Sequence, residues 1–269
     1  RIQGNWRIQK NVLTGHYRFL DNRNVRQAWG ILPACEFAFT KAVKSGKIPK
    51  LKPEAVVILH GLVRTRSSMS GLLRRVGETN PDWSVMALSY ASSQQTIAEH
   101  SRTLRKVVAA LDGVERVHFI AHSLGNLVVR RYLSDLKKDP AGLPKMGRIV
   151  MLGPPNQGSR LAELFKDDAI FRSVWGTSGA EIADWKKLSK TLAVPQSQFA
   201  IIAGGNKGNP LIKGKDDWVV SVEETKLAGA HDFLVLPVFH STMMDNVKVQ
   251  QATMRFLRSG KLRENGPRQ

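Results

Sequence analysis

Ser123 stands at a point in the sequence where a serine hydroxyl could act as a nucleophile. It lies in the stretch Ala-His-Ser-Leu-Gly, after the apolar run 117–121 and before an amphipathic run. These patterns predict a strand that turns sharply into a helix, and such a corner lifts the hydroxyl out of a sheet. The small residues Ala121 and Gly125 suit the close packing of the corner. A structural turn serine is the alternative interpretation.

A serine becomes reactive when a neighbouring base takes its proton, and in this role histidine is the usual base. The sites of parallel sheets lie at the carboxyl ends of the strands, so the base should follow a late strand. His240 follows the strand-like run 233–237, whereas His231 precedes it. We favour His240 as the base and keep His231 as the alternative. A surface histidine that caps the last helix is the non-catalytic interpretation of His240.

A carboxylate should orient that histidine. The run 199–205 predicts the preceding strand, and Asp216 and Asp217 follow it in the stretch Lys-Asp-Asp-Trp. Two adjacent carboxylates cannot both face one imidazole ring. We favour Asp217, which stands next to the apolar Trp-Val-Val, over Asp216. An ordinary turn or capping aspartate is the alternative for either residue.

Two backbone amides could bind the oxyanion that forms when a serine attacks a carbonyl group. One is the amide of Leu124, directly after the candidate nucleophile. The other is the amide of Leu62, in the loop after the strand-like run 55–59. In that loop Gly61 lets the backbone approach a substrate closely. His60 is expected to shape the loop rather than to react.

Strand-like and helix-like runs alternate after Pro53. The alternation predicts an α/β fold with a mostly parallel central sheet covered by helices on both faces. We expect residues 1–52 to form a basic segment packed on the same domain and residues 53–269 to form the catalytic domain. The insertion 154–198 is long for a plain loop and is expected to form a lid. The predicted strands are 55–59, 84–90, 116–121, 148–153, 199–205 and 233–237, and the predicted helices are 68–78, 94–111, 124–136 and 242–257.

The chain is unusually basic, with 41 lysines and arginines, 22 aspartates and glutamates, and a formal net charge of +19. Such a charge favours contact with an anionic membrane or polysaccharide surface. A solvated basic surface is the alternative. No zinc-ligand spacing and no nucleic-acid-binding motif stands out, so we expect no specific nucleic-acid partner. The first residue is Arg rather than Met, which together with the charge favours an exported or membrane-surface protein. The single cysteine, Cys35, excludes a disulfide within the chain and reads as a buried structural residue.

Five stretches, in the order ILHGLVRT, AHSLGN, LGPPNQGS, GGN…KDDWVV and VFHSTMM, resemble the α/β-hydrolase superfamily in its bacterial lipase and esterase branch. They span residues 55 to about 257. The resemblance implies a Ser-His-Asp triad of Ser123, His240 and Asp217, with no cofactor. Two departures stand out. Ala121 occupies a position where glycine is commoner in the superfamily, and Trp218 follows the aspartate where related lipases often have glycine.

The resemblance implies a serine carboxylester hydrolase that works through an acyl-enzyme intermediate, on acyl-lipid or other carboxylic ester substrates. An acyltransferase, a thioesterase or an amidase could use the same three residues. A non-catalytic protein that binds polyanions through its basic ends is an alternative of another class.

Overall fold

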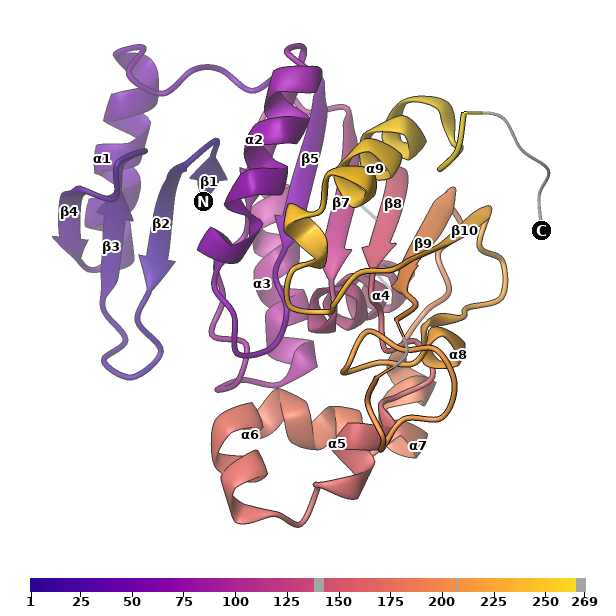
Figure 1. Cartoon of the computed structure of the whole chain (residues 1–269). Helices are drawn as coiled ribbons and strands as arrows, with labels where there is room; N and C mark the ends of the chain where they lie inside the picture. Colours follow the sequence, from indigo (N-terminus) through magenta and orange to yellow (C-terminus); the bar gives the residue numbers. More distant parts are fainter. Residues whose placement is uncertain (138–142, 207, 265–269) are drawn as a thin grey trace.

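A parallel sheet of six strands forms the centre of the molecule (Figure 1). The computed structural model describes residues 1–137, 143–206 and 208–264. The strand order is β6-β5-β7-β8-β9-β10, and every neighbouring pair is parallel. All the strands therefore end at one edge of the sheet. They are β5 (Glu54–Leu59), β6 (Trp83–Ala87), β7 (Arg116–His122), β8 (Lys145–Leu152), β9 (Phe199–Gly204) and β10 (Asp232–Leu236).

Helices cover both faces of this sheet, as the alternation of runs predicted. Alternate side chains of β5 enter two separate cores. Val57 and Leu59 pack with α3 (Ile97–Ala109) and α4 (Leu124–Leu136). Val56 and Ile58 pack with α2 (Ser70–Thr79) and α9 (Val247–Ser259) on the opposite face. The predicted α/β fold with a mostly parallel sheet is confirmed.

The last helix begins later than its apolar pattern suggests. The expected start lies near Thr242, but Met243–Asp245 form a 3₁₀ turn and α9 begins at Val247. The side chain of Asn246 accepts hydrogen bonds from the amides of Lys248 and Val249, so it caps the helix at this point.

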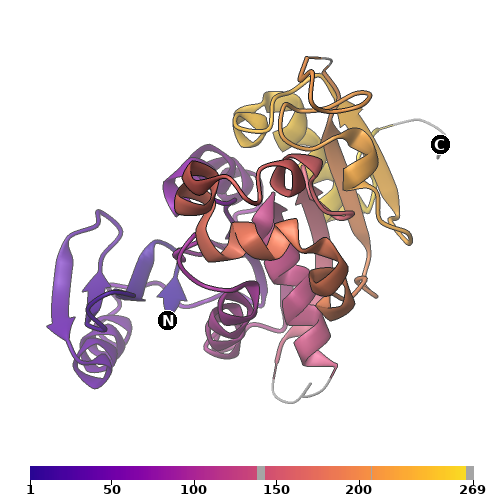
Figure 2. The same ribbon diagram turned by 90° about the horizontal axis from the view of Figure 1, so that it is seen from below.

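The basic N-terminal segment forms a small antiparallel sheet with one helix packed on it. The strands are β1 (Ile2–Gln3), β2 (Trp6–Lys10), β3 (Tyr17–Leu20) and β4 (Arg26–Gly30), and the helix is α1 (Leu32–Lys44). Phe19, Cys35 and Phe39 belong to a core of its own. In both views this small sheet lies beside the six-stranded sheet and its helices (Figures 1 and 2). It also contributes to the main core through the buried side chain of Ile2.

The insertion 154–198 contains three α-helices, α5 (Arg160–Leu164), α6 (Ala169–Ala183) and α7 (Trp185–Leu188), and a 3₁₀ turn at Ser189–Thr191. They lie beyond the carboxyl ends of the strands (Figure 1). Another short helix, α8 (Val222–Thr225), lies between β9 and β10. Within the described residues no helix is long and apolar enough to cross a membrane.

Candidate active site

Ser123 occupies the corner between β7 and α4, where its backbone has a left-handed φ of 51°. A non-glycine residue in this region costs on the order of 1–3 kcal/mol and persists where the surroundings enforce it. The Ser123 amide donates to the carbonyl of Leu152 on the neighbouring strand β8. Asn126 Nδ2 donates to the carbonyl oxygens of Ser123 and Leu152. These bonds tie the strained corner to the sheet.

The close packing around the serine leaves no room for a side chain at Gly125 or Gly61. A Cβ added to Gly125 would lie 2.9 Å from both the carbonyl oxygen of His60 and the Cβ of Leu59. A Cβ added to Gly61 would lie 3.1 Å from the Cβ of Ser123. The helix start is therefore pressed against β5, and the loop after β5 passes directly beside the serine.

His240 and Asp217 form a buried pair. His240 Nδ1 donates to Asp217 Oδ2 at 2.7 Å, which leaves His240 Nε2 as the nitrogen for proton transfer. The other carboxylate oxygen of Asp217 accepts the amides of Val219 and Val220 at 3.0 and 2.7 Å. The carboxylate is fully buried, and these three donors fix its position.

Asp216 does not face the histidine. Its Oδ1 accepts the amide of Trp218 at 2.7 Å, within the turn that delivers Asp217 to His240. Trp218 has a left-handed φ of 82°, which is the backbone conformation that glycine adopts without strain. This backbone conformation explains why related lipases often have glycine where this chain has Trp218. The bond from the Trp218 amide to Asp216 stabilises the turn.

His231, the alternative base, lies at the opposite edge of the sheet. It directly precedes β10, and its amide donates to the carbonyl of Phe199 at the start of β9. His240 follows β10, at the edge where Ser123 follows β7. The positions of the two histidines in the sheet therefore favour His240 and exclude His231 from this site.

The serine and histidine segments meet through His122, a contact that the sequence did not suggest. From the sequence, His122 adjoins the serine and is expected to point away from it. In the structure His122 Nε2 donates to the carbonyl of His240 at 2.9 Å, and the two rings lie 4.6 Å apart. Among the described residues the Ser123 hydroxyl has no hydrogen-bond partner. Catalytic hydrogen bonds of this kind often form only with substrate bound.

The loop after β5 is braced by an aromatic stack. His60 stacks on Tyr90 with ring centroids 4.1 Å apart, and the Tyr90 hydroxyl donates to the His60 carbonyl. His60 Nδ1 donates to the carbonyl of Gly61 at 2.9 Å. This arrangement holds the loop that carries Leu62 beside Ser123, and a loop-shaping role for His60 stays a prediction. Leu62 and Leu124 remain predicted oxyanion donors.

Both ends of the insertion are anchored by one buried arginine. Arg130 of α4 donates through Nε to the carbonyl of Ala193 and through a terminal nitrogen to the side chain of Asn156. Burial lowers the pKa of Arg130 to about 10. Farther along the insertion, the amide of Thr177 and the hydroxyl of Ser178 donate to carbonyls in the segment between β6 and α3. The insertion is thus fixed at its base and at α6.

Four buried histidines predict a strong loss of stability in mild acid. Burial lowers the pKa of His60 and of His100 to about 4, and it also lowers the pKa of His118 and His122. Between pH 6.5 and 4 the unfolded chain binds more protons than the folded chain. As the pH is lowered, the free energy of unfolding should therefore decrease by up to about 1.4 kcal/mol per pH unit for each such histidine. Urea unfolding at pH 7 and at pH 5 measures this decrease.

The exposed His231 provides the control for that measurement. Its removal in His231→Gln should leave the pH dependence unchanged, whereas His100→Leu should reduce the slope. A stability that stays flat from pH 7 to pH 5 would contradict the neutral, buried state of these rings.

No group of three or more potential metal ligands gathers within the described part of the chain. No family model matches the sequence. The bovine (Bos taurus) lysosomal thioesterase PPT2 is 24% identical over 211 residues, which cover 66% of this chain and 67% of the thioesterase.

Several solved structures have a similar fold. The mature Bacillus licheniformis lipase BlEst2 is 15% identical with a TM-score of 0.52, and the match covers 73% of this chain and 87% of the lipase. The Listeria innocua lin2722 product is 14% identical with a TM-score of 0.55, over 78% of this chain and 94% of that one. Legionella pneumophila phospholipase PlaB is 19% identical with a TM-score of 0.57, over 77% of this chain and 57% of PlaB. Together with the parallel sheet and the serine corner, these matches identify the chain as having the α/β-hydrolase fold.

Proposed function

We propose that this protein is a serine hydrolase that cleaves carboxylic esters. The observation that carries the proposal is the buried bond of 2.7 Å between His240 and Asp217, made beside Ser123, whose strained backbone is tied to the sheet by hydrogen bonds. Neither a structural turn serine nor a surface histidine accounts for a buried aspartate aimed at an imidazole at the edge where the serine lies. The pair is the arrangement that a nucleophilic serine requires.

In the proposed reaction, His240 Nε2 takes the proton of the Ser123 hydroxyl as its oxygen attacks the ester carbonyl. Asp217 holds the ring in the required tautomer and stabilises the imidazolium that forms. The amides of Leu62 and Leu124 are the proposed donors to the oxyanion. The protonated His240 then donates to the departing alcohol. Water activated by the same histidine releases the acid from the acyl-enzyme.

Acyl-lipid esters are the substrate class that we favour. BlEst2 is named a lipase and PlaB a phospholipase. The proposed lid, residues 154–198, exposes large apolar side chains that suit contact with acyl chains or with the apolar part of a lipid surface. These are Leu164, Phe165, Ile170, Val174 and Val194.

A thioesterase is the second candidate, and the bovine relative favours it by its name. A thioester carbonyl would meet the same serine, histidine and oxyanion donors. The alcohol leaving group would be replaced by a thiol, which departs more readily because its pKa is lower. The two candidates differ in substrate and share the catalytic residues.

A comparison of esters and thioesters tests the function. Hydrolysis of p-nitrophenyl esters with short to long acyl chains is measured beside hydrolysis of acyl-CoA thioesters of the same chain lengths. Preference for the oxygen esters supports the ester hydrolase, and preference for the thioesters favours the second candidate. Failure to cleave either class, together with no labelling by a fluorophosphonate probe, would exclude a working serine hydrolase.

A further inference from the structure

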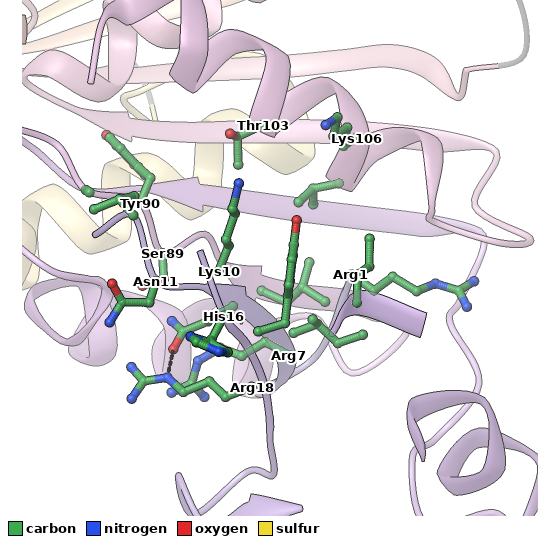
Figure 3. A pocket seen from close by; sticks show the side chains of 18 of the residues that line it. Arg1, Arg7, Lys10, Asn11, His16, Arg18, Ser89, Tyr90, Thr103 and Lys106 are labelled. Carbon is green, nitrogen blue, oxygen red and sulfur yellow. Dashed lines mark hydrogen bonds between the residues drawn. The ribbon is translucent and has the colours of Figure 1, made fainter. Parts of the chain in front are cut away.

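A large cleft lies between the N-terminal sheet and the catalytic domain (Figure 3). Its volume is about 940 Å³, within the range of small-molecule sites. Strands β2 and β3 line one wall, and α3 with the segment after β6 lines the other. In Figure 3 the side chain of Lys10 extends across the cleft toward Thr103 on α3. Ser123, His240 and Asp217 are not among the residues that line it, so the cleft is a site separate from the one described above.

Positive charge dominates the lining of this cleft. Of the described residues that line it, Glu36 is the one acidic side chain. Arg1 pairs with Asp112 at the rim. The other lysines and arginines of the lining make no ion pair with a described carboxylate; they are Arg7, Lys10, Arg18, Arg26 and Lys106.

Arg7 is the most informative of these cations, because it is only 6% exposed. Its two terminal nitrogens donate to the neutral oxygens of Asn5 and Asn24, and its Nε has no partner within the described residues. Burial, followed by the nearby guanidinium groups of Arg66 and Arg18, lowers the pKa of Arg7 to about 10. The charge of Asp21 opposes this shift only in part, and Arg7 forms no ion pair with a described carboxylate. A buried cation without a paired anion is costly, and an anion bound in the cleft would compensate that cost.

We propose that the cleft binds a soluble compound that carries several phosphate groups. Guanidinium groups bind phosphate oxygens through their N–H donors, and lysine adds a point charge. Arg7 Nε has no partner among the described residues, and Arg18 donates to a described residue only through Nε, to Gln9, which leaves its terminal nitrogens for a ligand. Lys10 and Lys106 come from the two opposite walls, so the cations suit several anionic groups on one ligand rather than a single ion. The recessed position of Arg7 suits a small molecule that enters the cleft better than a flat lipid surface.

The cleft is connected to the loop beside the serine. Tyr90 lines the cleft, and its hydroxyl donates to the carbonyl of His60. A ligand in the cleft would therefore contact the residue that braces the oxyanion loop. The binding proposal itself does not depend on ester hydrolysis.

Isothermal titration with inorganic tripolyphosphate at about 0.15 M salt tests the proposal, because non-specific surface attraction is largely screened there. The wild type should bind with a saturable heat. The double variant Lys10→Gln/Arg18→Gln should bind about tenfold more weakly or worse, since it loses two charge-assisted contacts. The matched control is Lys44→Gln/Lys47→Gln, which removes the same charge from exposed positions of the same segment outside the cleft. It should bind as the wild type does.

Three results would overturn the proposal. The first is an absence of saturable binding by the wild type. The second is an equal loss of affinity in both double variants, which would indicate a general charge effect. The third is a cleft variant that selectively loses sedimentation with phosphatidylglycerol vesicles while tripolyphosphate does not bind to any form, which would assign the cleft to a lipid surface. Thermal unfolding followed by circular dichroism verifies that the variants are folded.

Discussion

Ser123→Ala should abolish ester hydrolysis while leaving the fold intact. Loss of the nucleophile of a serine hydrolase lowers kcat by about 10⁴- to 10⁶-fold, because the remaining oxyanion donors and binding contacts supply little of the rate. Alanine keeps the Cβ and the hydroxyl has no partner among the described residues, so stability should change little. The measurement is kcat on the preferred p-nitrophenyl ester, with thermal unfolding as the check of the fold.

Ser123→Gly makes this test sharper. Glycine removes the cost of the left-handed φ at this corner, so this variant should be equally inactive but more stable, by about 1 kcal/mol. Loss of activity with a gain in stability would indicate that the strained backbone at Ser123 serves to position the hydroxyl. An alanine variant with near wild-type activity would exclude Ser123 as the nucleophile.

The central α/β fold could be predicted from the sequence because its helices and strands are long and their apolar side chains recur at regular spacing. The predicted helix 124–136 coincides with α4 (Leu124–Leu136), where a glycine and the strand before it mark the start. The N-terminal sheet was not predicted. Its strands are two to five residues long, so each carries too few alternations of apolar and polar side chains to be distinguished from a basic loop.

The candidate site was partly accessible in the same way. Chain order and strand ends pointed to Ser123 and His240, because parallel strands bring distant segments to one edge. The choice between Asp216 and Asp217 depends on the geometry of a turn. Two adjacent residues of the same type do not show in the sequence which of them faces the histidine. The contacts of His122 and Tyr90 join residues 118 and 30 positions apart, so no local pattern marks them.

Asp217→Asn is the second variant for which we expect a large effect. Asparagine retains the shape but carries no negative charge, so it neither stabilises the imidazolium nor favours the tautomer with Nε2 free. In a serine triad this change lowers kcat by about 10⁴-fold. The matched control is Asp216→Asn, which makes the same chemical change one residue away. Asparagine at that position can still accept the amide of Trp218, so kcat should remain near that of the wild type.

The two aspartate variants together separate orientation of the histidine from support of the turn. If Asp217 acts through His240, only Asp217→Asn should lower kcat, and KM should change little because neither side chain is proposed to touch the substrate. If the turn itself were the requirement, both variants would lose activity in proportion to their loss of stability. A large loss in Asp216→Asn with a mild effect in Asp217→Asn would reverse the assignment of the acid, and the bond of 2.7 Å to His240 would then be structural.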